Sequence, residues 1–143
     1  MLQVKLFTLY PDLCPGLLDG GIYKKARENK KWSLEVINIR DYAFDSNRTV
    51  DDTPFGGGSG MLLKPDVVAA AIDKNVTSKD KIIYLSPKGK KLDQHTIKSL
   101  SKLKNINILC GHFEGVDQRL LETRKIEEYS IGDFILSGGE SAS

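Results

Sequence analysis

Two short runs of uninterrupted apolar character constrain the fold of this chain most. Residues 81–86 read Lys-Ile-Ile-Tyr-Leu-Ser, and residues 105–110 read Asn-Ile-Asn-Ile-Leu-Cys. Such runs are typical of strands that are covered on both faces in a parallel sheet. Helical features lie beside them, because Pro65 suits a first helical turn and Asp93 is a good N-cap. The sequence therefore predicts an α/β domain with a mostly parallel sheet flanked by helices.

Weaker patterns supply the remaining elements. Apolar alternation predicts extended segments over residues 2–9, 32–39, 126–131 and 134–137. Helices are predicted over residues 20–29, 65–74, 93–103 and 116–123. Residues 40–60 are rich in Asp, Asn, Pro and Gly, so we expect a long loop there. No repeat or linker divides the sequence, and all 143 residues are assigned to one domain.

Composition narrows the setting in which the chain works. A 143-residue chain with 40% hydrophobic residues can build a core without a disulfide or metal staple. Cys14 and Cys110 lie in no metal-binding spacing, and isolated cysteines suit a reducing cytoplasm. The longest apolar stretch is far below the ~18–20 residues of a membrane span, and the N-terminus lacks the order of a secretory signal. We expect a cytoplasmic protein with no metal site and no membrane partner.

Charge alone does not identify a partner. The formal net charge of +2 is too small to indicate nucleic-acid binding. Lysines cluster at positions 88, 90 and 91 and again at 98, 102 and 104. Taken alone, these clusters are more typical of solvated faces than of a binding surface. His95 is expected on the exposed face of a helix, and its sequence distance from His112 gives no support to a catalytic dyad.

Three loops that contain glycine follow the apolar strands, at residues 85–89, 110–115 and 136–140. Ligands of parallel sheets bind beyond the carboxyl ends of the strands, and glycine allows close approach to the backbone. Each loop alone reads as an ordinary turn, but three at equivalent ends of neighbouring strands predict a shared pocket. The sequence contains neither a P-loop nor a dinucleotide-binding signature, so a nucleoside triphosphate is not the expected ligand. The glycine run at residues 56–60 fits a structural turn and a substrate contact equally well.

Glu114 is the carboxylate of most interest, because it follows a buried strand inside the second loop. An acid there suits a cationic ligand such as a sulfonium, or the hydrogen-bonding edge of a guanine. It equally suits the N-terminus of the following helix, where the helix dipole favours a negative charge. Position alone does not decide between these interpretations.

Five segments, in order, resemble motifs of the bacterial tRNA (guanine-N1)-methyltransferases, members of the knotted SPOUT superfamily. They are residues 48–52, 55–61, 83–94, 109–119 and 127–140. The resemblance spans essentially the whole chain and implies a trefoil-knotted α/β fold, which periodicity alone would not disclose. It leaves open whether the knot is complete within this chain. It also implies a homodimer with pockets at the subunit interface, and methyl transfer from S-adenosylmethionine.

The same resemblance implies roles for individual residues. It assigns the S-adenosylmethionine site to Tyr84, Leu85, Ser86, Pro87, Gly89, Gly111, Gly115, Ile131, Gly132, Asp133, Phe134, Ile135, Leu136, Gly138 and Gly139. Glu114 is expected near the methyl-transfer centre, and Arg48, Gly57 and Gly58 nearer the tRNA. Two positions depart from the family pattern: His112 replaces the usual arginine, and Phe134 a common tyrosine. A magnesium requirement is left open.

The implied target is N1 of guanine 37, in tRNAs that carry guanine at positions 36 and 37. That nitrogen carries a proton, so its methylation requires a general base. In the family, the assigned aspartate and a helical C-terminal tRNA-binding domain lie beyond the position of Ser143, and we expect negligible tRNA methylation from this chain alone. The alternative is a non-catalytic fragment that binds S-adenosylmethionine or dimerises. A weaker third interpretation is a nucleotide-binding α/β protein unrelated to tRNA.

Overall fold

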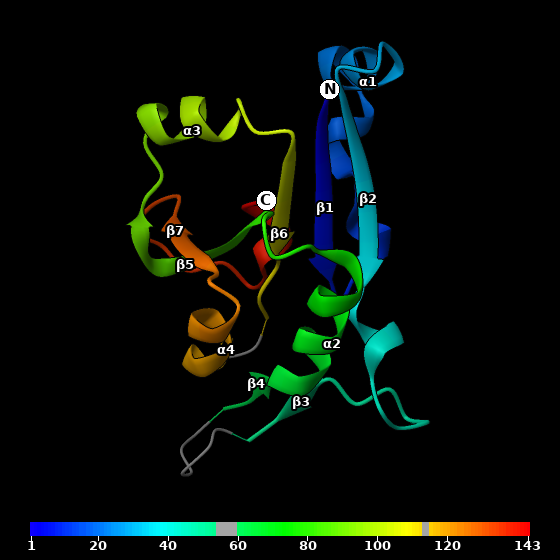
Figure 1. Cartoon of the computed structure of the whole chain (residues 1–143), viewed down its shortest axis with the longest axis vertical. Coiled ribbons are helices and arrows are strands. Elements are labelled where there is room, and N and C mark those ends of the chain that lie inside the picture. The colour runs from blue at the N-terminus through cyan, green and yellow to red at the C-terminus, as the bar shows by residue number, and fades with distance from the viewer. Residues whose placement is uncertain (54–59, 113–114) are drawn as a thin grey trace.

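The computed structural model describes residues 1–53, 60–112 and 115–143. A five-stranded sheet with the order β2-β1-β6-β5-β7 forms its centre (Figure 1). All of its pairings are parallel, so the prediction of a mostly parallel α/β fold is confirmed. The strands are β1 (Leu2–Thr8), β2 (Trp32–Asn38), β5 (Lys81–Lys91), β6 (Asn105–Leu109) and β7 (Glu127–Ser130).

The two apolar runs lie in the middle of this sheet, as predicted. β6 pairs with β1 on one side, where Phe7 faces Leu109 in register, and both side chains are fully buried. β5 pairs with β6 on the other side, and its Ile82, Ile83 and Tyr84 are buried in succession. Burial of successive residues requires cover on both faces, which explains why these segments do not alternate in polarity.

Helices in the described part of the chain surround the sheet (Figure 1). α2 begins at Pro65 and buries Val67, Val68, Ala71 and Ile72 in the core. The predicted cap of α3 is confirmed, because Asp93 accepts a hydrogen bond of 2.8 Å from the Thr96 amide. The α-helices are α1 (Gly21–Glu28), α2 (Pro65–Asn75), α3 (Gln94–Leu100) and α4 (Gln118–Thr123). Short 3₁₀ helices span Pro11–Leu13, Gly16–Asp19, Ile39–Tyr42 and Gly139–Ser141.

The expected loop at residues 85–89 is instead part of β5. The strand continues to Lys91, and its register with β7 shifts between Leu85 and Lys90. Gly89 permits this, because a Cβ there would meet the backbone N and C atoms of Tyr129 at 2.5 Å. The glycine that suggested a turn therefore allows close approach of a neighbouring strand.

Two further expectations require correction. Residues 134–137 form bends and irregular backbone rather than a strand, since the segment turns back over the loop after β6. The predicted long loop over 40–60 contains the end of the Ile39–Tyr42 helix and the strand β3 (Asp51–Asp52), which pairs antiparallel with β4 (Leu62–Leu63).

The two ends of the sheet differ in what surrounds them. α1 and α3 lie at the end where β1 begins, whereas β3, β4 and α4 lie toward the end where it finishes (Figure 1). The carboxyl ends of β5, β6 and β7 are therefore bordered by α4 and by the chain segments that follow these strands. Within the described ranges, no helix combines the length and apolar character needed to cross a membrane.

Candidate functional site

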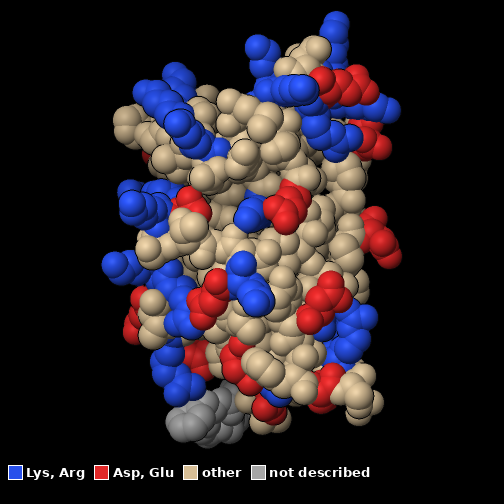
Figure 2. Space-filling model, turned by 45° about the vertical axis from the view of Figure 1, so that its right-hand side comes forward, with Lys and Arg blue, Asp and Glu red and all other residues tan. Residues whose placement is uncertain are grey.

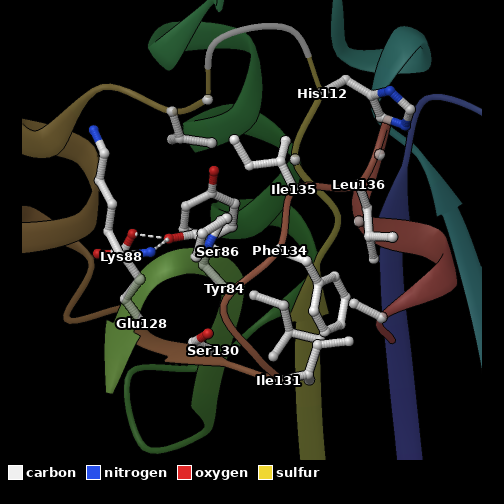
Figure 3. A pocket seen from close by; sticks show the side chains of 18 of the residues that line it. Tyr84, Ser86, Lys88, His112, Glu128, Ser130, Ile131, Phe134, Ile135 and Leu136 are labelled. Carbon is white, nitrogen blue, oxygen red and sulfur yellow. Dashed lines mark hydrogen bonds between the residues drawn. The ribbon is translucent and has the colours of Figure 1, made fainter. Parts of the chain in front are cut away.

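A cavity of about 350 Å³ opens beside the carboxyl ends of β5, β6 and β7. Its walls come from the distal part of β5, the segment after β6 and the segment after β7 (Figure 3). These are the three glycine-containing segments of the sequence, which the strand order places next to one another. The volume lies within the range of roughly 300–1,000 Å³ that is common for small-molecule sites.

Most of the residues expected to bind a cofactor surround this cavity. They are Tyr84, Leu85, Ser86, Pro87, Gly111, Gly115, Ile131, Gly132, Phe134, Ile135, Leu136, Gly138 and Gly139. Gly89 and Asp133 are not among the lining residues. The structure brings the set together, and their role in binding a cofactor stays a prediction.

The residues expected near the RNA are placed differently. Arg48 does not line the cavity; it pairs with Asp41 and donates a 3.4 Å hydrogen bond to the Arg40 carbonyl. Gly57, Gly58 and Glu114 lie outside the described residues, so their predicted roles remain predictions.

Two polar residues of the wall, Glu128 and Ser130, were not predicted from the sequence as binding residues. Lys88 and His112, which lie within the predicted loops, line the cavity as well. Glu128 and Ser130 are two residues apart on β7, so their side chains leave the same face of the strand. The spacing of two residues shows in the sequence that both side chains lie on one face of a strand. It identifies that face as a pocket wall only when β7 is known to lie beside β5.

Glu128 organises the wall formed by β5 and β7. Its Oε1 accepts a hydrogen bond of 2.5 Å from Ser86 Oγ, and Ser86 Oγ accepts one of 3.1 Å from the Lys88 amide (Figure 3). Burial, with a smaller contribution from Glu128, raises the pKa of Tyr84 to about 12. Among the described residues that line the cavity, Glu128 carries the only carboxylate. The cavity therefore has one carboxylate and one lysine on this wall, and a neutral phenol at neutral pH.

The segment after β7 contributes apolar surface. Ser130 Oγ fixes its first turn, because it donates to the Gly132 carbonyl at 2.9 Å and accepts from the Gly132 amide at 3.2 Å. The side chains that follow are exposed to a degree unusual for apolar residues, with Phe134 51% and Ile135 87% exposed. Exposed apolar groups beside a cavity suit contact with a ligand or a partner.

Glu140 attaches the end of this segment to the rest of the domain. Its Oε2 lies 2.6 Å from His112 Nε2, and its Oε1 accepts a hydrogen bond from Thr8 Oγ1. The Gly139 amide also donates to the Gly111 carbonyl at 2.9 Å. These bonds hold the third segment against both the second segment and the end of β1.

The described residues contain no group of three or more His, Cys, Asp or Glu side chains that could hold a metal ion. Burial raises the pKa of the Cys110 thiol to about 12, so this thiol is protonated at neutral pH. Burial is also the main cause that raises the pKa of Cys14. Neither cysteine has the lowered pKa typical of a reactive thiol.

The fold and the site together define an α/β domain with a candidate small-molecule site. The cavity lies at the carboxyl edge of a parallel sheet, where such folds bind ligands. The walls combine glycine backbone, apolar side chains and a few polar groups, which is the usual composition of a cofactor pocket.

The chain belongs to the tRNA (guanine-1)-methyltransferase TrmD family, whose model matches residues 2–143. It is 62% identical to the tRNA (guanine-N(1)-)-methyltransferase of Pelagibacter ubique, over 100% of this chain and 63% of that protein. Proteins with the same name from Agrobacterium fabrum and Rhodospirillum rubrum are 52% and 46% identical, over 99% of this chain and 61% and 59% of theirs. The family resemblance of the sequence motifs is confirmed. The chain spans about three fifths of the length of these relatives.

Deprotonation of Tyr84 should lower the unfolding free energy of the chain at alkaline pH. The folded pKa of Tyr84, about 12, exceeds its ordinary value of 10.0, so its contribution is complete below pH 10 and is lost as the pH rises toward 12. Between pH 10 and 12, the unfolding free energy of the unmodified chain should fall with rising pH. In Tyr84→Phe this slope should be shallower by up to about 1.4 kcal/mol per pH unit. Urea unfolding at several pH values measures this. Tyr23→Phe, at an exposed position, is the control, and equal slopes in all three proteins would contradict the assignment.

Gly139→Ala should disturb the packing of the third segment. A Cβ at Gly139 would meet the Cys110 Cα and the Gly111 amide at 2.8 Å, and backbone cannot move aside as a side chain does. We expect a loss of about 1–3 kcal/mol of unfolding free energy, measured by urea denaturation. Gly20→Ala is the matched control, because its nearest neighbour lies 4.0 Å away. A similar loss in both variants would show that the close contact is unimportant.

Proposed function

We propose that this chain is the S-adenosylmethionine-binding part of an enzyme that methylates guanine N1 in tRNA. One observation carries the proposal: the three motif segments of a family member converge on one cavity at the carboxyl edge of the sheet. The names of the similar proteins supply the reaction and the substrate. S-adenosylmethionine is the methyl donor that such a reaction implies.

The residues of the cavity fit this donor. S-adenosylmethionine carries a cationic sulfonium and ammonium, a carboxylate, a ribose and a flat adenine. Glu128 offers a negative charge to the cationic groups of the donor. Ile135 and Leu136 offer apolar surface to the adenine, and the glycine segments offer backbone groups.

The contribution of the chain to the reaction is mainly positional. The bound cofactor supplies a methyl group on an activated sulfonium, and transfer requires the acceptor nitrogen in line with that bond. Holding two reactants in such a geometry supplies much of a rate enhancement. The hydrogen bond that Ser86 donates to Glu128 and the contact between His112 and Glu140 keep the cavity walls in place before the ligand enters.

The finer target is guanine 37 in tRNAs with guanine at positions 36 and 37. Its N1 proton requires a general base, which the family resemblance assigns to an aspartate outside these 143 residues. Negative charge that develops at O6 requires donors or cations, as in other sites that stabilise anionic transition states. Glu114, in the second segment, is proposed to lie near this centre. A magnesium requirement would be revealed by loss of turnover in a chelator.

A homodimer in the cytoplasm completes the proposal. Exposed apolar side chains support the dimer: Leu17 is 95% and Ile22 76% exposed, and Ile135 beside the cavity is 87% exposed. Exposed apolar side chains of this size are typical of protein contacts. A cytoplasmic location follows from the proposed tRNA substrate.

The alternative is a fragment that binds S-adenosylmethionine or dimerises without catalysis. One observation favours it: the basic groups on the described wall of the cavity are already engaged, since His112 Nε2 lies 2.6 Å from a carboxylate oxygen of Glu140. The Tyr84 phenol has a pKa of about 12, and one oxygen of Glu128 is occupied by Ser86.

Cofactor binding is tested by isothermal titration calorimetry of this chain. We expect S-adenosylmethionine to bind at least about tenfold, or 1.4 kcal/mol, more tightly than ATP. Ser86→Ala removes the donor to Glu128 and should weaken binding by about 0.5–1.5 kcal/mol. Ser99→Ala on α3 is the matched control and should bind normally. Preference for ATP would favour the third interpretation, a nucleotide-binding protein unrelated to tRNA.

Methyl transfer is tested in a chimera, in which this chain replaces the matching segment of the Pelagibacter ubique relative. Mass spectrometry of digested tRNA should show 1-methylguanosine at position 37, and none when position 37 is adenosine. The chain alone should give negligible product. A chimera that binds S-adenosylmethionine but methylates nothing would support the non-catalytic alternative.

A further inference from the structure

Positive charge is concentrated in two segments of the chain, residues 24–31 with a net charge of +4 and residues 88–104, and only the second reaches the candidate site. Residues 88–104 contain six of the 21 basic residues and one of the 19 acidic residues, which gives the segment a net charge of +5. The rest of the chain then carries −3, since the whole carries +2. The six residues, named here the lysine track, are Lys88, Lys90, Lys91, Lys98, Lys102 and Lys104.

The charge of the lysine track is exposed and largely uncompensated. All six side chains belong to exposed residues, and none forms an ion pair with the acidic side chains that the structure describes. By contrast, Lys81 pairs with Glu127 and Arg124 with Asp73. A solvated face usually intersperses the two signs of charge, and this segment does not.

Asp93 is the single acid of the segment, and it is engaged locally. Its carboxylate accepts the Thr96 amide hydrogen at 2.8 Å and so caps α3. The bonds to Thr96 are the main cause that lowers its pKa, and Lys90 adds a smaller effect. Lys90 also contributes to the lowered pKa of Glu127, after the bonds that Lys81 and Tyr129 make. Lys90 thus acts electrostatically on both carboxylates without forming an ion pair with either.

The track begins at the candidate site and leads away from it. Lys88 lines the cavity, Lys90 and Lys91 end β5, and the other three lie on α3 and in the turn before β6. Pairing of Lys90 with Tyr129 and of Lys91 with Ser130 fixes this path. Figure 2 shows Lys and Arg side chains, with a few Asp and Glu side chains among them, along its left margin.

We propose that the lysine track binds the phosphate backbone of the RNA whose guanine occupies the cavity. The RNA partner rests on the proposed function; the surface is assigned from charge and geometry. Lysines act as point charges on phosphates, and each contact releases condensed counterions. A base in the cavity remains joined to its flanking phosphates, so Lys88 would meet the nearest and Lys98 to Lys104 more distant ones. An anionic membrane fits this segment less well. Membrane-surface helices insert a whole apolar face, whereas the described residues of this segment expose a single large apolar side chain, Ile97.

The test compares two triple charge reversals of this chain. The track variant is Lys98→Glu, Lys102→Glu and Lys104→Glu, and none of these residues lines the cavity. The matched control is Lys24→Glu, Lys25→Glu and Lys31→Glu, on α1 and the turn after it, with the same change in net charge. The probe is a fluorescein-labelled anticodon stem-loop with guanine at positions 36 and 37, followed by anisotropy between 50 and 200 mM NaCl.

We expect the track variant to bind this RNA at least tenfold more weakly, and the control to stay within threefold of the unmodified chain. The slope of log Kd against log salt should fall by about 2–3 in the track variant, at roughly 0.7–0.9 per lost phosphate contact. Equal effects in both variants, or no effect in either, would overturn the proposal. Tighter binding to phosphatidylglycerol vesicles than to RNA, through the same lysines, would overturn it as well.

Calorimetry with S-adenosylmethionine separates this proposal from the proposed function. Both variants should keep the affinity of the unmodified chain, which also shows that they fold. Loss of RNA binding in the track variant with no cofactor binding in any protein would support the track and refute the function. Normal cofactor binding with an unchanged RNA affinity would refute the track alone.

Discussion

The fit of Gly139 against the Cys110–Gly111 backbone is the contact on which the candidate site depends. No side chain fits there, and the Gly139 amide hydrogen bond to Gly111 holds the two segments at that distance. Glu140 then fastens the same segment to His112 and to Thr8 of β1. The cavity exists because the chain after β7 returns over the ends of its neighbouring strands and stays there.

The charged side chains of the cavity and of the lysine track suit the two proposed reactants. The described wall of the cavity carries one carboxylate, Glu128, which suits a ligand with cationic groups. Along the lysine track, which leads away from the cavity, the charge is positive, because residues 88–104 carry a net charge of +5. A cationic donor within and a polyanionic acceptor outside would therefore each meet the opposite charge.

The sequence predicted the central features of the fold because they are local. Continuous apolar runs showed which strands are central, and Asp93 and Pro65 marked helix starts through side-chain and ring geometry. The extension of β5 to Lys91 was missed, since it depends on Gly89 packing against Tyr129, forty residues away in the sequence. The same holds for Glu128, whose place in the cavity wall follows from the pairing of β7 with β5.

The central claim is that the distal part of β5 and the segments after β6 and β7 together form the S-adenosylmethionine site. A crystal structure of this chain grown with S-adenosylmethionine tests it most directly. We expect electron density for the donor between Ser86, Gly111 and Leu136, with its cationic groups toward the carboxylate of Glu128. Density for the donor elsewhere on the domain, with this cavity occupied only by solvent, would contradict the account.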